Sequence, residues 1–297
     1  MAKRVKTLRE FVKPFRIDDG AGFRLKDFDP ADTNALKSKE HAAEILEDGI
    51  ARLAELQDKL YAQDQWAVLV ILQGMDGAGK DSTVKHVMSG VNPMGCSAIG
   101  FKVPSEEELQ HDYLWRTARF LPARGSIGIF NRSYYEEVLV VRVHPEALER
   151  EKLPKELVTD KIWQERYEDI NAHELYLSHN GIVILKFFLN LSQKEQKKRF
   201  LKRLDEPEKN WKFQLSDVQE RQYWDDYMSA YEKMVRNTST GHAPWHVVPA
   251  DHKWFAHVVV AETIIDALEK LDLDYPKLDA ERRAELKKVR AFLEHEK

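Results

Sequence analysis

The sequence predicts an α/β fold in which a mostly parallel sheet is covered by helices. Apolar runs of strand length alternate with segments of helical spacing along most of the 297 residues. The runs are apolar at successive positions, which is typical of strands buried on both faces of a parallel sheet. No repeat, low-complexity stretch or Gly/Ser/Pro-rich linker divides the chain, so we expect one main domain with an extension at each end.

Five strands are expected, and the first is the most distinct. Trp66 to Gln73 reads WAVLVILQ, an unbroken apolar run that is followed by a Gly-rich turn and a helix. Because parallel strands are joined by crossover connections, helices are expected between them. In chain order, the expected strands are residues 66–73, 96–103, 125–131, 182–189 and 245–249.

Capping residues mark where several helices are expected to begin. Ser38 is a suitable N-cap, and two capping boxes pair Ser105 with Glu108 and Ser192 with Glu195. Besides the helix after the Gly-rich turn, the expected helices are 38–63, 105–120, 160–179, one from 192, one capped by Ser216 and Gln219, and 253–271.

Three regions are expected along the chain. Residues 1–37 form an N-terminal arm, 38–275 form the main domain, and 276–297 form a C-terminal helix. In this last segment, Leu286, Val289 and Leu293 stand among charges. It therefore fits a peripheral helix, a subunit contact or a solvated tail helix, and the sequence alone leaves these three open.

Composition excludes several classes of protein. The chain has 46 Lys+Arg against 50 Asp+Glu, a net charge of −4, which gives no overall attraction to nucleic acid or to a membrane surface. The single cysteine, Cys96, cannot form an intramolecular disulfide. No apolar run nears the roughly 18 residues needed to span a bilayer, and no signal-peptide core follows the basic N-terminus. We expect a cytoplasmic protein.

A phosphate-binding loop joins the first strand to its helix. Residues 74–82 read GMDGAGKDS and contain the G-x-x-x-x-G-K pattern in the strand–loop–helix setting that it requires. Backbone N–H groups and the helix N-terminus favour phosphate oxygens, and Lys80 reaches the transferring phosphates. The residues expected to cradle phosphates are Gly77, Ala78, Gly79, Lys80, Asp81 and Ser82.

The loop departs from the common pattern after its lysine. Asp81 stands where Ser or Thr normally holds magnesium, and Ser82 comes one residue late, about 100° further round the helix. Asp76 supplies an additional carboxylate inside the loop and is the first candidate for the metal ligand. Asp81 has an alternative interpretation as a charge that simply favours a helix N-terminus.

A second group of polar residues follows the third strand in the segment FNRSYYEE. In P-loop enzymes this strand end faces the phosphates and commonly carries a metal-binding Asp, but here it carries Asn131. Arg132 is the candidate phosphate ligand. Glu136 is the candidate for contact with metal or acceptor, or for a general base. A salt-bridged helix start is the alternative.

Further cations suggest a polyanionic substrate. Lys102 ends the second strand, Arg116 lies on the following helix, and Arg142 follows the third strand. Residues 192–225 are expected to form a helical lid, since P-loop kinases often place a mobile cationic segment there. The lid cations singled out are Arg199, Arg203, Lys212 and Arg221, whereas Lys197, Lys198 and Lys202 also fit a solvated helix face.

Together, these residues resemble the polyphosphate kinase 2 family over about residues 38–275. The resemblance is carried by GMDGAGKDSTVKHVM, NPMG, FKVPSEEELQHDYLWR, LPARGSIGIFNRSYYEEVLVVRVHP, KFFLNLSQKEQKKRF, NWKF and APWHVVPADHKWF. It implies a three-layer α/β/α sandwich of the P-loop kinase type, similar to thymidylate kinase. It also implies a homo-oligomer, either a dimer or a tetramer.

The resemblance further implies phosphoryl transfer from inorganic polyphosphate to nucleotides. Lys80 would bind the transferred phosphate and Asp76 would hold Mg²⁺, with Mn²⁺ as an alternative metal. Members that prefer nucleoside diphosphates tend to carry Asp at the position of Asn131 and Asn at that of Glu136. This chain therefore resembles class III, which accepts both AMP and ADP; adenine and guanine nucleotides are the expected acceptors.

The residues that the resemblance assigns to phosphate groups fall into two sets. Donor and acceptor phosphates would be gripped by Lys102, Arg116 and Arg132. Lys212 and Arg221 would belong to a lid over a polyphosphate tunnel.

Three alternatives to this function stay open. An ATP-dependent nucleoside monophosphate kinase would need the same loop and lid, and a polyphosphate kinase restricted to ADP would differ at the acceptor. A non-catalytic phosphate-binding protein is the alternative from another class. The phosphoryl donor that supports turnover, ATP or polyphosphate, distinguishes the ATP-dependent kinase from a polyphosphate kinase.

Overall fold

The computed structural model describes residues 10–34, 36, 38–210 and 215–296. Its sheet has six strands in the order β1-β6-β5-β2-β4-β3. The strands are β1 (Arg16–Ile17), β2 (Ala67–Gln73), β3 (Cys96–Gly100), β4 (Ile127–Asn131), β5 (Ile182–Asn190) and β6 (Trp245–Pro249). All neighbours are parallel except β1, which is antiparallel to β6. The five expected strands are confirmed.

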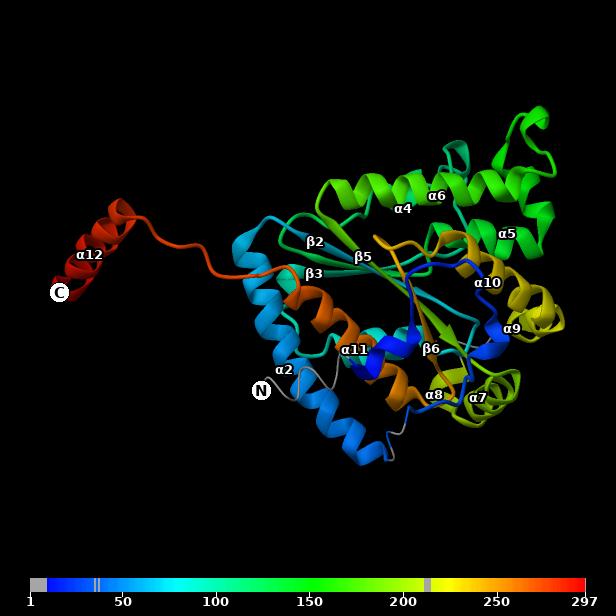
Figure 1. Ribbon diagram of the computed structural model, residues 1–297, viewed down its shortest axis with the longest axis horizontal. Coiled ribbons are helices and arrows are strands. Elements are labelled where there is room, and N and C mark those ends of the chain that lie inside the picture. Colours follow the sequence, from blue (N-terminus) through cyan, green and yellow to red (C-terminus); the bar gives the residue numbers. More distant parts are fainter. Residues whose placement is uncertain (1–9, 35, 37, 211–214, 297) are drawn as a thin grey trace.

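Helices cover both faces of the sheet, so the protein is a three-layer sandwich (Figure 1). Alternate residues of β2 divide between the two faces of the sheet: Val68 and Val70 join one buried core, whereas Leu69 and Ile71 join the other. This division explains the unbroken apolar run of the strand. The first layer contains α2 (Lys39–Gln63), α3 (Lys80–Val87) and α11 (Lys253–Glu269). The second contains α5 (Val140–Val143), α6 (Ile162–His179) and α10 (Trp224–Thr238).

Helix caps predicted from the sequence determine two of the helix starts. The Ser38 hydroxyl accepts a hydrogen bond from the His41 amide at the start of α2 (3.1 Å). At α7 (Gln193–Asp205), the Ser192 hydroxyl accepts one from the Glu195 amide in the same way (3.1 Å). Two short helices, α8 (Pro207–Asn210) and α9 (Leu215–Gln219), follow α7. Ser216 lies inside α9, so its prediction as an N-cap is wrong.

The predicted helix 105–120 is also wrong, because two caps compete for it. The capping box forms, with the Glu108 amide donating to the Ser105 hydroxyl (3.2 Å), but only a 3-10 turn, Glu108–Gln110, follows. Asp112 then accepts hydrogen bonds from the Leu114 and Trp115 amides and starts a separate helix, α4 (Trp115–Ala118). Asp112 acts as a second cap within the predicted helix and therefore divides it.

The N-terminal segment packs against the core through apolar residues. Val12, Phe15 and Phe23 are buried, and Arg16–Ile17 adds the edge strand β1 to β6. This two-residue strand was not predicted, because alternation of polar and apolar residues cannot be detected over so short a length.

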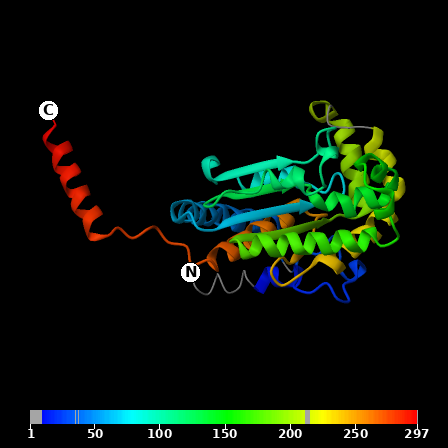
Figure 2. The ribbon, with the colours of Figure 1, turned by 90° about the horizontal axis from the view of Figure 1, so that it is seen from above.

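The C-terminal helix α12 (Ala280–His295) lies apart from the sandwich, at the end of an extended segment (Figures 1 and 2). It has no buried residue, and Phe292 and Leu293 are 70% and 60% exposed. Throughout the described residues, no helix combines the length and apolar character needed to cross a bilayer.

Candidate active site

The phosphate-binding loop connects β2 to α3 and lies at the carboxyl ends of the parallel strands. Gly74 has φ of 153°, and a Cβ there would approach the Leu189 carbonyl oxygen of β5 to 2.9 Å. Gly79 has φ of 106° and caps α3, whose N-terminal amides face the loop. Both positions therefore need glycine, and the loop forms the concave backbone surface that binds phosphate groups.

Lys80 lies inside this loop with 8% of its side chain exposed. Its Nζ donates to the Gly74 carbonyl (2.6 Å) and lies 3.9 Å from Asp76 Oδ1. Burial is the main cause that lowers the pKa of Lys80, and Arg132 lowers it further. An anionic ligand would stabilise the charged amine in this position.

Arg132 connects the loop to the segment that follows β4. Its Nη2 donates to Asp76 Oδ1 (2.7 Å), and its Nη1 donates to Glu136 Oε2 (3.2 Å). Glu136 raises the pKa of Arg132, an effect that burial opposes and Asp76 reinforces. Burial disfavours the charge of Asp76, but Lys80 and Arg132 outweigh it and lower the pKa of Asp76. The sequence-predicted residues Asp76, Lys80, Arg132 and Glu136 thus lie together.

Asn131 and Asp81 also meet, across the start of α3. The Asn131 amide donates to Asp81 Oδ1 (2.6 Å), so the residue that replaces the common Asp of this strand end orients the loop carboxylate. Ser82 instead approaches His257 of α11, with Oγ 3.3 Å from Nε2. Its hydroxyl is therefore engaged with α11.

The carboxylates of the loop fit a metal that is bound largely by substrate. Among the described residues, no cluster of three or more His, Cys, Asp or Glu side chains could hold a metal alone. Mg²⁺ in phosphoryl-transfer sites usually takes one or two carboxylates, with phosphate oxygens and water completing its coordination. Asp76 and Asp81, which stand at the phosphate-binding loop, match that donor set.

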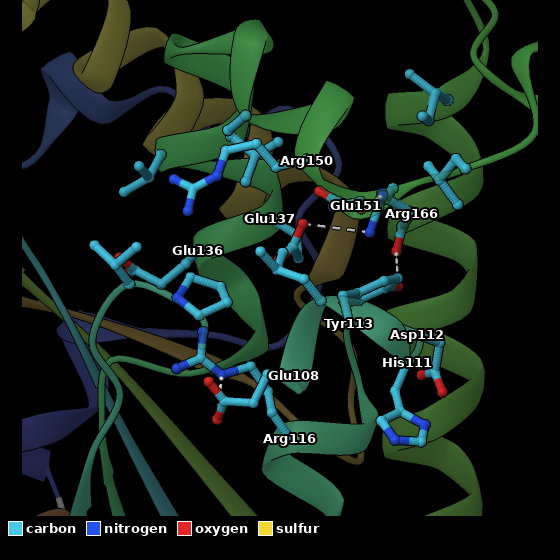
Figure 3. A pocket seen from close by; sticks show the side chains of 18 of the residues that line it. Glu108, His111, Asp112, Tyr113, Arg116, Glu136, Glu137, Arg150, Glu151 and Arg166 are labelled. Carbon is cyan, nitrogen blue, oxygen red and sulfur yellow. Dashed lines mark hydrogen bonds and ion pairs between the residues drawn. The ribbon is translucent and has the colours of Figure 1, made fainter. Parts of the chain in front are cut away.

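A cavity of about 460 Å³ lies beside the loop (Figure 3). Its wall includes Arg132 and Glu136 from the site above, and Lys102 and Arg116 from the segment after β3. Arg116 donates to the Lys102 carbonyl (2.7 Å) and packs over the Phe101 ring. A cavity of this size accommodates a nucleotide-sized ligand.

Arg142 lies outside this cavity wall. Its Nη1 donates to the Tyr167 hydroxyl (3.0 Å), and its guanidinium packs over the Trp163 ring. These contacts assign it to the packing between α5 and α6. None of these contacts places Arg142 near the loop or the cavity, so they do not support its expected role in phosphate binding.

The predicted lid cations lie in different settings. Arg199 on α7 donates to four backbone carbonyls, those of Gly77 and Ala78 in the loop and those of Ala250 and Asp251 after β6. Arg199 therefore links the loop to the segment after β6 and stabilises the loop conformation. Arg203 lies 3.8 Å from Asp217, and Arg221 donates to Gln196 of α7. The prediction for Lys212 lies outside the described residues.

Sequence reasoning missed two features of the cavity. Arg150 lines it without a hydrogen bond or ion pair to any described residue. A buried cluster of Glu137, Glu151 and Arg166 also forms part of the wall. Glu137 adjoins Glu136 in the FNRSYYEE segment, but nothing local to Glu151 or Arg166 indicates that the three residues meet.

The fold and site together define a P-loop phosphotransferase, with a phosphate-binding loop, a buried lysine and convergent arginines at the carboxyl ends of a parallel sheet. The family model described as polyphosphate kinase 2 matches residues 36–276. The chain belongs to the polyphosphate kinase 2 family.

Named relatives agree with this family over nearly full length. The chain is 51% identical over 283 residues to the ADP-polyphosphate phosphotransferase of Rhodopseudomonas palustris, covering 95% of this chain and 98% of the relative. It is 46% identical to the AMP/ADP-polyphosphate phosphotransferase of Meiothermus ruber, covering 89% and 96%. The crystal structure of polyphosphate kinase 2 from Arthrobacter aurescens superposes with a TM-score of 0.84 at 42% identity, covering 93% and 96%.

Proposed function

We propose that the protein transfers the terminal phosphoryl group of inorganic polyphosphate to AMP and to ADP, reversibly and with Mg²⁺. The observation that carries the proposal is the placement of Lys80 inside the phosphate-binding loop and of Arg132 between that loop and the cavity. Two relatives whose names state ADP or AMP/ADP as substrates support the acceptor class.

In the proposed reaction, an anionic oxygen of the acceptor phosphate attacks the terminal phosphorus of polyphosphate, and the bond to the bridging oxygen breaks. The acceptor oxygen already carries charge at neutral pH, so no strong base is needed. Lys80 and Arg132 stabilise the charge on the transferring group, and Arg116 orients the acceptor phosphate. Asp76 would hold Mg²⁺, or Mn²⁺ in its place, and the bound ion would supply further neutralisation of phosphate charge.

Class III membership is part of the proposal. Glu136 accepts a hydrogen bond from the guanidinium of Arg132 and lines the cavity, and these two contacts support a role for Glu136 in acceptor choice. We also propose a domain over residues 38–275 with a lid at 192–225, a homodimer or homotetramer, acceptance of guanine nucleotides, and a cytoplasmic location.

The test is an acceptor panel of AMP, ADP, GMP and GDP with polyphosphate and Mg²⁺. Wild type should phosphorylate both AMP and ADP. The Glu136→Asn variant should lose AMP use and retain ADP use. Glu149→Gln, at an exposed residue outside the cavity wall, should change neither. Unchanged AMP use by Glu136→Asn would show that Glu136 has no role in acceptor choice.

A polyphosphate kinase restricted to ADP is the second candidate, because the name of the relative at 51% identity specifies ADP alone. The same panel separates the two candidates. Wild type that uses ADP and leaves AMP unphosphorylated would favour the second.

A further inference from the structure

Three buried charged residues from separate segments meet in the wall of the cavity. Glu137 follows β4, Glu151 ends the 3-10 segment Pro145–Glu151, and Arg166 lies on α6. Arg166 Nη1 lies 3.3 Å from Glu137 Oε2, and its Nη2 donates to Glu151 Oε2 at 2.5 Å. Only 5% of Arg166, 8% of Glu137 and 13% of Glu151 is exposed.

The two carboxyl groups of the cluster share one guanidinium and also hydrogen-bond to each other. Oε1 of Glu151 is buried and receives no N–H donor from the described residues. Burial raises the pKa of Glu137 to about 8, and the neighbouring Glu151 contributes to the rise. An unsatisfied buried acceptor is costly, so such groups usually have a ligand or a structural reason.

The position of the cluster in the cavity indicates which part of a ligand it faces. In Figure 3, Arg116 and Glu136 occupy one side of the cavity, and Glu137, Glu151 and Arg166 occupy the other. Apolar side chains, including Val140, Leu153 and Ile162, complete the wall. A nucleotide whose phosphates lie toward Arg116 and Arg132 would present its base to the acid cluster.

We propose that Glu137 and Glu151 bind the base of the acceptor nucleotide and select bases that carry an exocyclic amino group. This inference rests on the proposed function. The Glu151 carboxylate and the carbonyl oxygen of the largely protonated Glu137 both accept hydrogen bonds from N–H donors, whereas a base with no N–H donor leaves them unsatisfied. Arg166 fixes both carboxyl groups, so they keep one geometry for the amine.

The most direct test compares AMP with purine riboside 5′-monophosphate, which differs only in lacking the 6-amino group. With polyphosphate as donor, wild type should show a kcat/KM for AMP that is at least about 10-fold higher, mainly through a lower KM. A ratio near one for wild type would overturn the inference.

Two variants then assign the selectivity to the cluster. Glu151→Gln keeps the shape of the side chain but removes its charge, and Glu137→Leu removes the carboxyl group, so each should reduce the ratio to about threefold or less. Glu149→Gln is the matched control, because Glu149 is an exposed glutamate of the same segment as Glu151 and lies outside the cavity wall. A full wild-type ratio in both folded variants would overturn the inference; if neither variant folds, the wild-type ratio decides.

Calorimetric titration of the two nucleotides separates this inference from the proposed function. Equal binding of AMP and purine riboside 5′-monophosphate would contradict the inference even where polyphosphate-dependent turnover of AMP is observed. Tighter binding of AMP without any turnover would support the inference and contradict the proposed reaction.

Discussion

Lys80 has almost no contact with solvent, and carbonyl oxygens of its own loop surround it. Asp76 lies 3.9 Å away, while Arg132 repels the amine. A phosphate group entering the loop would supply negative charge to both cations, and the gain would be largest where charge on the transferring group is greatest.

The Lys80→Met variant should therefore lose about 100-fold or more in kcat while remaining folded. Steady-state kinetics with polyphosphate and AMP provide the measurement. Lys85→Met is the matched control, since Lys85 is an exposed lysine of the same helix. Activity within a few-fold of wild type in Lys80→Met would exclude a direct role for the amine.

Glu137 should make stability depend on pH. Its pKa is raised from 4.5 to about 8, so the folded state binds this proton more tightly than the unfolded state does. The resulting stabilisation is fully present below about pH 4.5 and is lost as the pH rises toward 8. Melting temperatures measured from about pH 5 to 8.5 should fall by several degrees, and by less in Glu137→Gln. Equal pH dependence in both proteins would refute this assignment.

Residue roles could be predicted from sequence where the chemistry is local. The loop motif located Asp76 and Lys80, and the segment after β4 located Arg132 and Glu136, because each set lies within one strand-to-helix connection. The partners of Arg199 could not be predicted in this way. Its four carbonyl acceptors come from segments far apart in the chain, and a cationic helix looks the same whether its arginine faces solvent or backbone.

At the scale of elements, α7 supports the phosphate-binding loop. Arg199 joins α7 to the loop and to the residues after β6, and Gln196 of the same helix donates to the Asp76 carbonyl (2.8 Å). The loop conformation therefore depends on a helix that begins more than a hundred residues later in the chain.

Replacing Arg199 with Met should lower the free energy of unfolding by about 2–4 kcal/mol, because backbone carbonyls lose their donor. Activity should fall as well, because the phosphate-binding loop loses the hydrogen bonds from Arg199 that hold its conformation. Denaturant unfolding measures the first effect, with Lys197→Met as an exposed control on the same helix. If both variants unfolded at the same denaturant concentration, the bracing role would be wrong.

Elements were predictable where one local signal was strong. Four of the five longer strands are largely buried apolar runs, whereas the edge strand β3 is half-buried or exposed. The Ser38 and Ser192 caps act locally. The errors arose where signals compete or are too short, as in the helix divided by Asp112 and in the edge strand Arg16–Ile17. The pairing of β1 with β6 depends on contacts across the whole chain.

For the whole molecule, the sandwich contains the buried core and α12 lies outside it (Figure 2). Deleting residues 276–297 should change the melting temperature by no more than about 2 °C, because no side chain of α12 is buried. A deletion from residue 253 onward should prevent folding, because it also removes the buried residues of α11. A large loss of stability in the shorter deletion would show that α12 contributes to the fold.

The central claim is that polyphosphate is the phosphoryl donor. The most direct test incubates the purified protein with long-chain polyphosphate, Mg²⁺ and AMP, with no nucleoside triphosphate added, and follows the nucleotides by chromatography. If polyphosphate is the donor, ADP forms first and ATP follows. Turnover of AMP that required added ATP, with none from polyphosphate, would contradict that claim.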